Sequence, residues 1–285
     1  MSWKTVIIGT SAIALALATV LMAGCGIGLG PTQEVTINEP LGSAAVTDVV
    51  LGMGAGKLTV QPGADGLASG LISYNVPAWK PVVTRTDSSL TIKQGSTKGL
   101  PGVGSDIVND WNLKLGSPPL RLTVTAGAYE GSYDLGGLSL QKLSIKDGAS
   151  KSNVTFSAPN LSQMESLTYD TGASSVTMTG LGDANFKKLD FKGGAGSFTL
   201  DFSGQLRTSG AANITAGVGT VHIIVPSATA AKVQVKGALS SVTHEGAWVI
   251  TNKTYATPAA GGGQQGKLLT ITVDMSVGSL TLTTE

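Results

Sequence analysis

Apolar and polar residues alternate along most of the chain after residue 30, and short turns rich in glycine and alanine interrupt the alternation. One unit joins two alternating runs through Gly-Ala and a small residue. It occurs at 143–156, 167–178 and 189–200, and with Val replacing Ala at 212–223. A period of two places apolar side chains on one face of a strand. The pattern therefore predicts many short strands joined by tight turns.

The glycines of these units recur at nearly constant spacing. They are Gly148, Gly172, Gly194 and Gly217, which are 24, 22 and 23 residues apart. One unit cannot bury its apolar face alone, but stacked copies can, each pairing its backbone with the next at about 4.8 Å. We predict an all-β fold, a parallel β-solenoid resembling a single-stranded β-helix, with rungs of 22–24 residues and glycine over glycine. A sandwich of antiparallel hairpins is the alternative.

The repeat divides the chain unevenly. Weaker copies lie at 51–60, near Gly127, near Gly237 and at 273–282. Residues 34–120 fit the repeat less well, and 94–108 are rich in Gly, Ser and Pro, which is typical of an irregular loop. Because terminal repeats are usually atypical, we expect a cap and first rungs at 34–120 and the solenoid repeats at 121–285.

The N-terminus has the layout of an export signal. Lys4 supplies a positive start, residues 6–23 carry no charge, and Ala23 and Gly24 precede the single cysteine, Cys25. This ending resembles the lipobox of bacterial lipoproteins, although Met22 stands where Leu is usual. We predict a signal peptide at 1–24, helical in its apolar part, then a lipidated Cys25 and a flexible tether at 25–33. The alternative is an uncleaved transmembrane helix.

Composition narrows the function classes. Charged residues make up 13% of the chain, Gly numbers 39, and the formal net charge is +1. High hydrophobicity with low charge argues against disorder. Without an overall field or a basic run, we set nucleic-acid binding aside and expect no basic patch. A single cysteine excludes an internal disulfide.

Several segments together resemble a known family. GMGAGKLTV, AWKPVV, NDWNLKL and the Gly-Ala repeats that follow are similar, in this order, to the toastrack domains, in particular the LiaF-like branch associated with the cell-wall-active antibiotic response. The resemblance covers most of residues 45–285. It implies a β-solenoid at the cell envelope, linked to stress sensing or adhesin-like. LiaF-like proteins usually carry several membrane helices before this domain, whereas this sequence has one signal segment.

The residues give no catalytic, metal or cofactor site. His222 and His244 are isolated in strand-like stretches, and His222 occupies an outward position, so we expect solvated histidines without metal. The carboxylates Asp147, Asp170, Asp190 and Asp201 fall in different columns of the repeat, so we expect them on a solvated face without the pairing of a glycosidase. Recognisable hydrolase and nucleotide-binding motifs are absent from the sequence.

Rare aromatics form the most distinctive local groups. Trp79, Lys80 and Pro81 lie together, and Trp111 and Trp248 are separate. Such residues either present a platform for sugars or peptides or plug the open end of a β core. We favour the plug.

These observations predict a non-catalytic, membrane-anchored extracytoplasmic lipoprotein that binds an envelope peptide, glycan or protein, or senses envelope stress. No cofactor and no nucleic acid are expected, and the ligand-binding residues remain open. One alternative is a self-associating structural or adhesin-like envelope protein, because exposed strand edges allow lateral association. The other is a carbohydrate-active enzyme on a β-helix scaffold.

Overall fold

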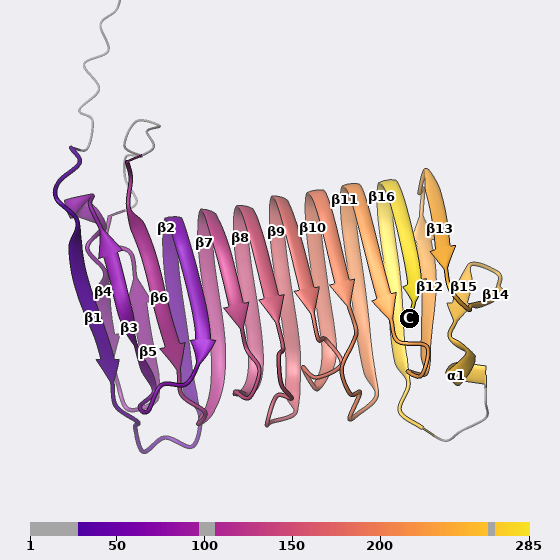
Figure 1. Cartoon of the computed structure of the whole chain (residues 1–285), viewed down its shortest axis with the longest axis horizontal. Helices are drawn as coiled ribbons and strands as arrows, with labels where there is room; N and C mark the ends of the chain where they lie inside the picture. Colours follow the sequence, from indigo (N-terminus) through magenta and orange to yellow (C-terminus); the bar gives the residue numbers. More distant parts are fainter. Residues whose placement is uncertain (1–27, 97–105, 262–265) are drawn as a thin grey trace, which may run out of the picture.

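A computed structural model of the chain describes residues 28–96, 106–261 and 266–285. The predicted signal peptide and Cys25 lie outside the described residues. Most described residues are in strands, so the all-β prediction is confirmed. In the described residues sixteen strands form one sheet, and the long strands stand side by side in a rack (Figure 1). No helix in this part of the chain is both long enough and apolar enough to cross a membrane.

The elements follow one another in chain order. They are β1 (Gln33–Glu39), β2 (Thr47–Pro62), β3 (Ala68–Tyr74), the 3-10 turn η1 (Pro77–Trp79), β4 (Val82–Arg85), β5 (Ser89–Lys93), β6 (Asn109–Leu115), β7 (Pro119–Asp134), β8 (Ser139–Thr155), β9 (Met164–Thr179), β10 (Phe186–Asp201), β11 (Gly210–Val225), β12 (Ala231–Gly237), β13 (Ser241–Glu245), β14 (Val249–Thr251), β15 (Thr254–Ala256), α1 (Pro258–Gly261) and β16 (Leu269–Thr284).

Each long strand folds over at its Gly-Ala turn and so encloses its own apolar side chains. In β10, Leu189 and Phe191 precede the turn, Phe198 and Leu200 follow it, and all four are buried. The rings of Phe191 and Phe198 meet with centroids 5.1 Å apart at an interplanar angle of 62°. The two halves of the strand therefore face each other across a shared interior, where burial of apolar area stabilises the fold.

Neighbouring long strands pair in parallel, so equivalent positions form columns along the stack. β7 pairs with β8, β8 with β9, β9 with β10 and β10 with β11. The turn glycines lie in register: a Cβ on Gly172 would come within 2.3 Å of the Gly148 carbonyl oxygen, and a Cβ on Gly194 within 2.5 Å of that of Gly172. Glycine is required here because its neighbour's backbone occupies the space of a side chain.

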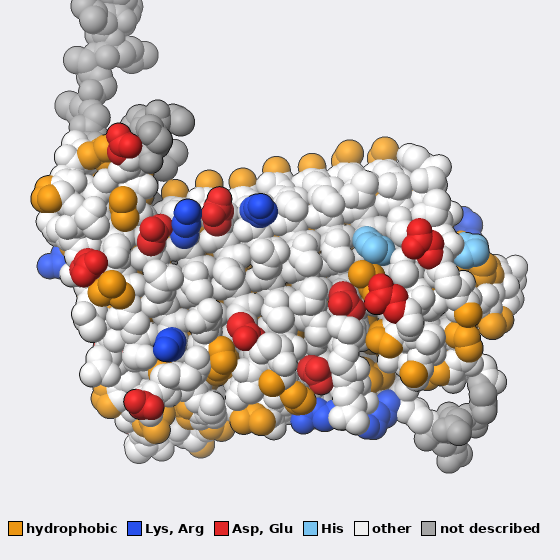
Figure 2. Space-filling view, viewed as in Figure 1, with side chains coloured by type: hydrophobic (Ala, Val, Ile, Leu, Met, Phe, Trp, Pro, Cys, Tyr) orange, Lys and Arg blue, Asp and Glu red, His pale blue; other side chains and the backbone are white. Residues whose placement is uncertain are grey.

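The alanine or valine that follows the turn glycine of each long strand, or that follows Ser276 in β16, forms the crest of the stack. The crest residues are Ala55, Ala128, Ala149, Ala173, Ala195, Val218 and Val277. Figure 2 shows them as a line of hydrophobic side chains along the upper edge. We call the surface made by strand halves before the crest the ascending face and the surface made by halves after it the descending face, which is the one in front in Figures 1 and 2.

The order of strands departs from the order of the repeats at both ends. The C-terminal strand β16 inserts between β11 and β12, and β2 lies between β7 and the shorter strands β5 and β6. Each end is then closed by a rung made of two separate strands, β5 with β6 and β12 with β13. Antiparallel strands β1, β3, β4, β14 and β15 cover these rungs. As a result, β2 and β16 are paired with other strands along both of their edges, so neither leaves an edge of unpaired backbone groups.

Candidate interaction surfaces

A buried carboxylate lies inside the stack, immediately below the turn of β8. Asp147 is 6% exposed, and the column that contains it otherwise holds small or apolar residues beside Thr171: Met53, Ala126, Gly193, Ala216 and Met275. The expectation of a solvated Asp147 is therefore wrong. In every repeat the residue before the turn glycine points inward, whatever its polarity. In β8 this inward position holds an aspartate, where most other repeats have a small or apolar residue.

Hydroxyl groups surround this carboxylate. The Tyr169 hydroxyl donates to Asp147 Oδ2 at 2.8 Å, the Ser150 hydroxyl donates to the same oxygen at 3.1 Å, and Thr171 donates to Oδ1. The Tyr129 and Tyr133 hydroxyls lie 2.9 Å apart beside them. Burial raises the pKa of the Tyr169 phenol far above its ordinary value, with the charges of Tyr129 and Asp147 adding to the shift. The cluster is a closed hydrogen-bond network that satisfies a buried charge.

The other predicted site residues are dispersed. Asp170, Asp190 and Asp201 are partly exposed and lie in different columns, as predicted. His222 is half-buried, with Nε2 2.9 Å from Thr283 Oγ1, while His244 is exposed with its ring 5.9 Å from that of Tyr255. The described residues hold no group of three metal-ligating side chains.

The three tryptophans in the described residues, Trp79, Trp111 and Trp248, occupy the ends of the stack. Trp79 and Trp111 are 2% and 1% exposed and pack at the N-terminal end, which favours the plug over the exposed platform. Trp248 is partly buried against Tyr255 at the C-terminal end, with ring centroids 6.2 Å apart.

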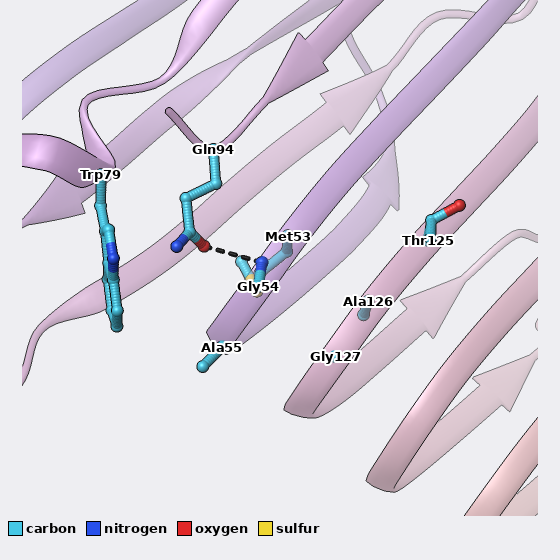
Figure 3. A pocket seen from close by; sticks show the side chains of 8 residues that line it. All are labelled: Met53, Gly54, Ala55, Trp79, Gln94, Thr125, Ala126 and Gly127. Atoms are coloured by element: carbon cyan, nitrogen blue, oxygen red, sulfur yellow. Dashed lines mark hydrogen bonds between the residues drawn. The ribbon is translucent and has the colours of Figure 1, made fainter. Parts of the chain in front are cut away.

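A split rung explains the hollow beside Trp79. No strand crosses the crest between β5 and β6 in the described residues, so two side-chain amides bind the backbone at the turn of β2. Gln94 Oε1 accepts from Gly54 N at 2.8 Å (Figure 3), and Asn109 Nδ2 donates to Ala55 O at 2.5 Å. A hollow of about 430 Å³ remains between Trp79, this turn and β7. Its lining is mainly apolar, and we regard it as part of the end closure.

Charge separates between the two faces of the stack. Nine cations project from the ascending face: Lys93, Arg121, Lys142, Lys146, Lys187, Lys188, Lys192, Lys232 and Lys236. Five carboxylates project from it: Asp48, Glu165, Asp170, Asp190 and Asp274.

The descending face has the opposite balance. Three cations project from it: Lys57, Lys114 and Lys151. Five carboxylates project from it: Asp110, Glu130, Asp134, Asp201 and Glu245. Figure 2 shows part of this face, including acidic and basic side chains that alternate along a short row below the crest.

The basic columns contradict the expectation that no basic patch exists. The lysines come from different repeats, so no run appears in the sequence, and only strand pairing places them together. A signal was present: Lys-x-x-x-Lys pairs occur at 142/146, 188/192 and 232/236. Superposing the repeats would have aligned them.

Comparison with known proteins agrees with this geometry. The chain matches the N-terminal domain of toast_rack, DUF2154, over residues 29–179 and again over 164–224. This chain belongs to the toast_rack family. The resemblance to toastrack domains is thus confirmed, while the LiaF-like branch stays a prediction. No curated protein matches the chain.

Solved structures are similar to this toast_rack chain at low sequence identity. A provisionally described cell adhesion protein from Clostridium sporogenes ATCC 15579 has 18% identity and a TM-score of 0.48, covering 89% of this chain and 100% of that one. A provisionally described adhesin from Bacteroides fragilis NCTC 9343 has 12% identity and a TM-score of 0.34, covering 90% and 100%. At these values the similarity carries no argument about function.

Proposed function

We propose that this toast_rack protein is a non-catalytic binding module of the cell envelope, tethered outside the membrane by a lipid on Cys25. In this proposal the long strands are rungs of a β-solenoid, and those from β8 to β11 follow one another at 22–24 residues. The observation that carries it is the segregation of charge between two broad, regular faces. A rigid array of this kind fits an extended partner better than a small substrate, because its polar groups form columns and do not converge on one point.

The position of the first described residues supports a tether at the crest side. Gly30 N donates to Asn75 O at 2.8 Å, and Asn75 follows β3 where that strand ends opposite the start of β6. Asn109, the first residue of β6, bonds the turn of β2. Gly30 is five positions after Cys25, a reach of at most about 18 Å. A lipid on Cys25 would therefore hold the N-terminal end of the crest near the membrane.

The anchor is tested by labelling cells with an alkyne-bearing fatty acid and fractionating them. The wild-type chain should carry the label and sediment with membranes, and Cys25→Ala should lose both properties, because stable attachment requires acyl chains. A control, Ser11→Ala, changes the apolar segment without touching the cysteine and should behave as wild type. A Cys25→Ala chain that stays in the membrane would favour the uncleaved helix. An unlabelled wild type would refute the lipid anchor.

Self-association is a second candidate, favoured by the C-terminal edge of the sheet. β14 is the outermost strand of the sheet at that end, and its Val249 and Ile250 are 58% and 47% exposed. An exposed apolar edge can pair with another chain. Sedimentation velocity against concentration tests this candidate, with Val249→Lys as the variant and Leu161→Lys, at an exposed loop residue, as the control. A concentration-independent monomer would exclude it.

A further inference from the structure

Four cations lie in one column across the ascending face, near the starts of the strands. Arg121 on β7 pairs in register with Lys142 on the neighbouring strand β8. Ser166 lies between Lys142 and Lys188, and Ala211 and Thr270 lie between Lys188 and Lys232. We call this column the basic row. It crosses seven strands, β7 to β12, a length of about 29 Å at the usual strand spacing.

The basic row contains no carboxylate in its own column between Arg121 and Lys232. Beside the column, exposed Glu165 precedes Ser166 on β9, and exposed Lys187 lies opposite it on β10. Asp48 lies beyond Arg121, at 3.5 Å from it, and Asp190 binds Lys188 from the adjacent column at 2.7 Å. Within the described residues, Lys142 and Lys232 have no carboxylate at ion-pair distance, and both are exposed. Two of the four cations, Lys142 and Lys232, therefore carry charge that no described carboxylate pairs, while Arg121 and Lys188 each share theirs with a neighbouring aspartate.

The columns closer to the crest differ. Asp170 lies between Lys146 and Lys192, and Asp274 lies beside Lys236, so the charges alternate. Asp190 lies in the column between these residues and the basic row. Among the columns of the ascending face, the basic row thus has the largest excess of cations over carboxylates within its own column.

We propose that the basic row binds a linear anionic polymer of the envelope, laid along the long axis of the stack. Lysine ammonium groups at intervals of about 10–14 Å can neutralise anionic groups that recur along a chain. A flat anionic membrane fits less well, because it would also meet Asp170, Asp190 and Asp274. The row also lies seven residues before the crest, roughly 23 Å from it along the strand, on the side away from the proposed tether. This last point rests on the proposed function; the charge pattern does not.

Binding is measured on the purified full chain in a neutral detergent, with fluorescently labelled long-chain inorganic polyphosphate as the probe and neutral dextran as the blank. The test variant is Lys142→Ser/Lys188→Ser/Lys232→Ser. The matched control, Lys57→Ser/Lys114→Ser/Lys151→Ser, removes the same charge from exposed strand positions on the descending face. We expect the first variant to weaken polyphosphate binding about tenfold or more, and the control less than about twofold. Affinity should fall as salt rises.

Three outcomes would overturn the proposal. Equal losses in both triple variants would mean that net charge alone attracts the probe. No saturable binding of polyphosphate by the wild-type chain would remove the site. Binding to vesicles containing phosphatidylglycerol, lost in the first variant, without polyphosphate binding would assign the row to the membrane instead. Cys25→Ala should bind polyphosphate as wild type does, so failure of the anchor and failure of the basic row can be told apart.

Discussion

Replacing glycines by alanine provides the sharpest test of the fold, because the expected loss of unfolding free energy has two separable causes. One is the contact of the new Cβ with neighbouring backbone, and the other is backbone strain at a positive φ. In Gly172→Ala the new Cβ would lie 2.3 Å from the Gly148 carbonyl oxygen, with no positive φ. In Gly219→Ala it would lie 1.9 Å from the Gly196 carbonyl oxygen, at a φ of +137°. Gly137 has a φ of +71° and nothing within 4 Å of its Cβ position. The three substitutions therefore represent contact alone, both causes, and backbone strain alone.

The magnitudes follow from the size of each cause. Overpacking a close contact costs about 1–3 kcal/mol, and a left-handed backbone costs a non-glycine residue about 1–2 kcal/mol. Alanine also lowers the conformational entropy of the unfolded chain, which offsets about 0.4–1 kcal/mol of the lost unfolding free energy. We expect a loss of unfolding free energy of about 1–2 kcal/mol for Gly172→Ala, about 1 kcal/mol or less for Gly137→Ala, and about 2–4 kcal/mol for Gly219→Ala.

Urea unfolding followed by far-ultraviolet circular dichroism measures these differences. Thermal unfolding gives a second readout, in which Gly219→Ala should lower Tm by roughly 5–10 °C for a chain of this size. Gly261→Ala is the control, since its Cβ position has nothing within 4 Å. If Gly172→Ala and Gly261→Ala have the same stability, the stacked turns are not in close contact and the reasoning is wrong.

Three further predictions concern the interior. Trp79→Ala should cost about 3–5 kcal/mol of unfolding free energy, because it removes a buried ring; unchanged thermal stability would favour a binding platform instead. Asp147→Ala should cost about 2–4 kcal/mol by leaving its hydroxyl donors without an acceptor, and Asp147→Asn should cost less; urea midpoints equal to that of wild type would show that the network contributes nothing. The raised pKa of Tyr169 favours its neutral form in the folded state, so its stabilisation is complete below about pH 10 and falls as the pH rises further. Melting curves across this range should show a smaller loss for Tyr169→Phe, and an identical loss would contradict the assignment.

Part of the site could have been found from the sequence, and part could not. The column positions of Asp170, Asp190 and Asp201 follow from alternation, since a strand places every second residue on one face. The same rule places Asp147 inward, but polarity alone argued for the surface, and only its tyrosine and serine neighbours make the burial tolerable. The basic row was missed because charges were sought in runs along the chain.

What the sequence determined by itself is the repeating unit: strands that alternate, a turn that requires glycine, and a spacing that lets Gly148, Gly172 and Gly194 align. These are local requirements of sterics and burial, so they are written into each repeat. The tertiary structure decided the ends. β16 enters between β11 and β12, and the side chains of Gln94 and Asn109 bind the backbone at the turn of β2. Repeats with similar edges can pair in more than one order, so the order depends on which arrangement satisfies every backbone group, a property of the whole stack.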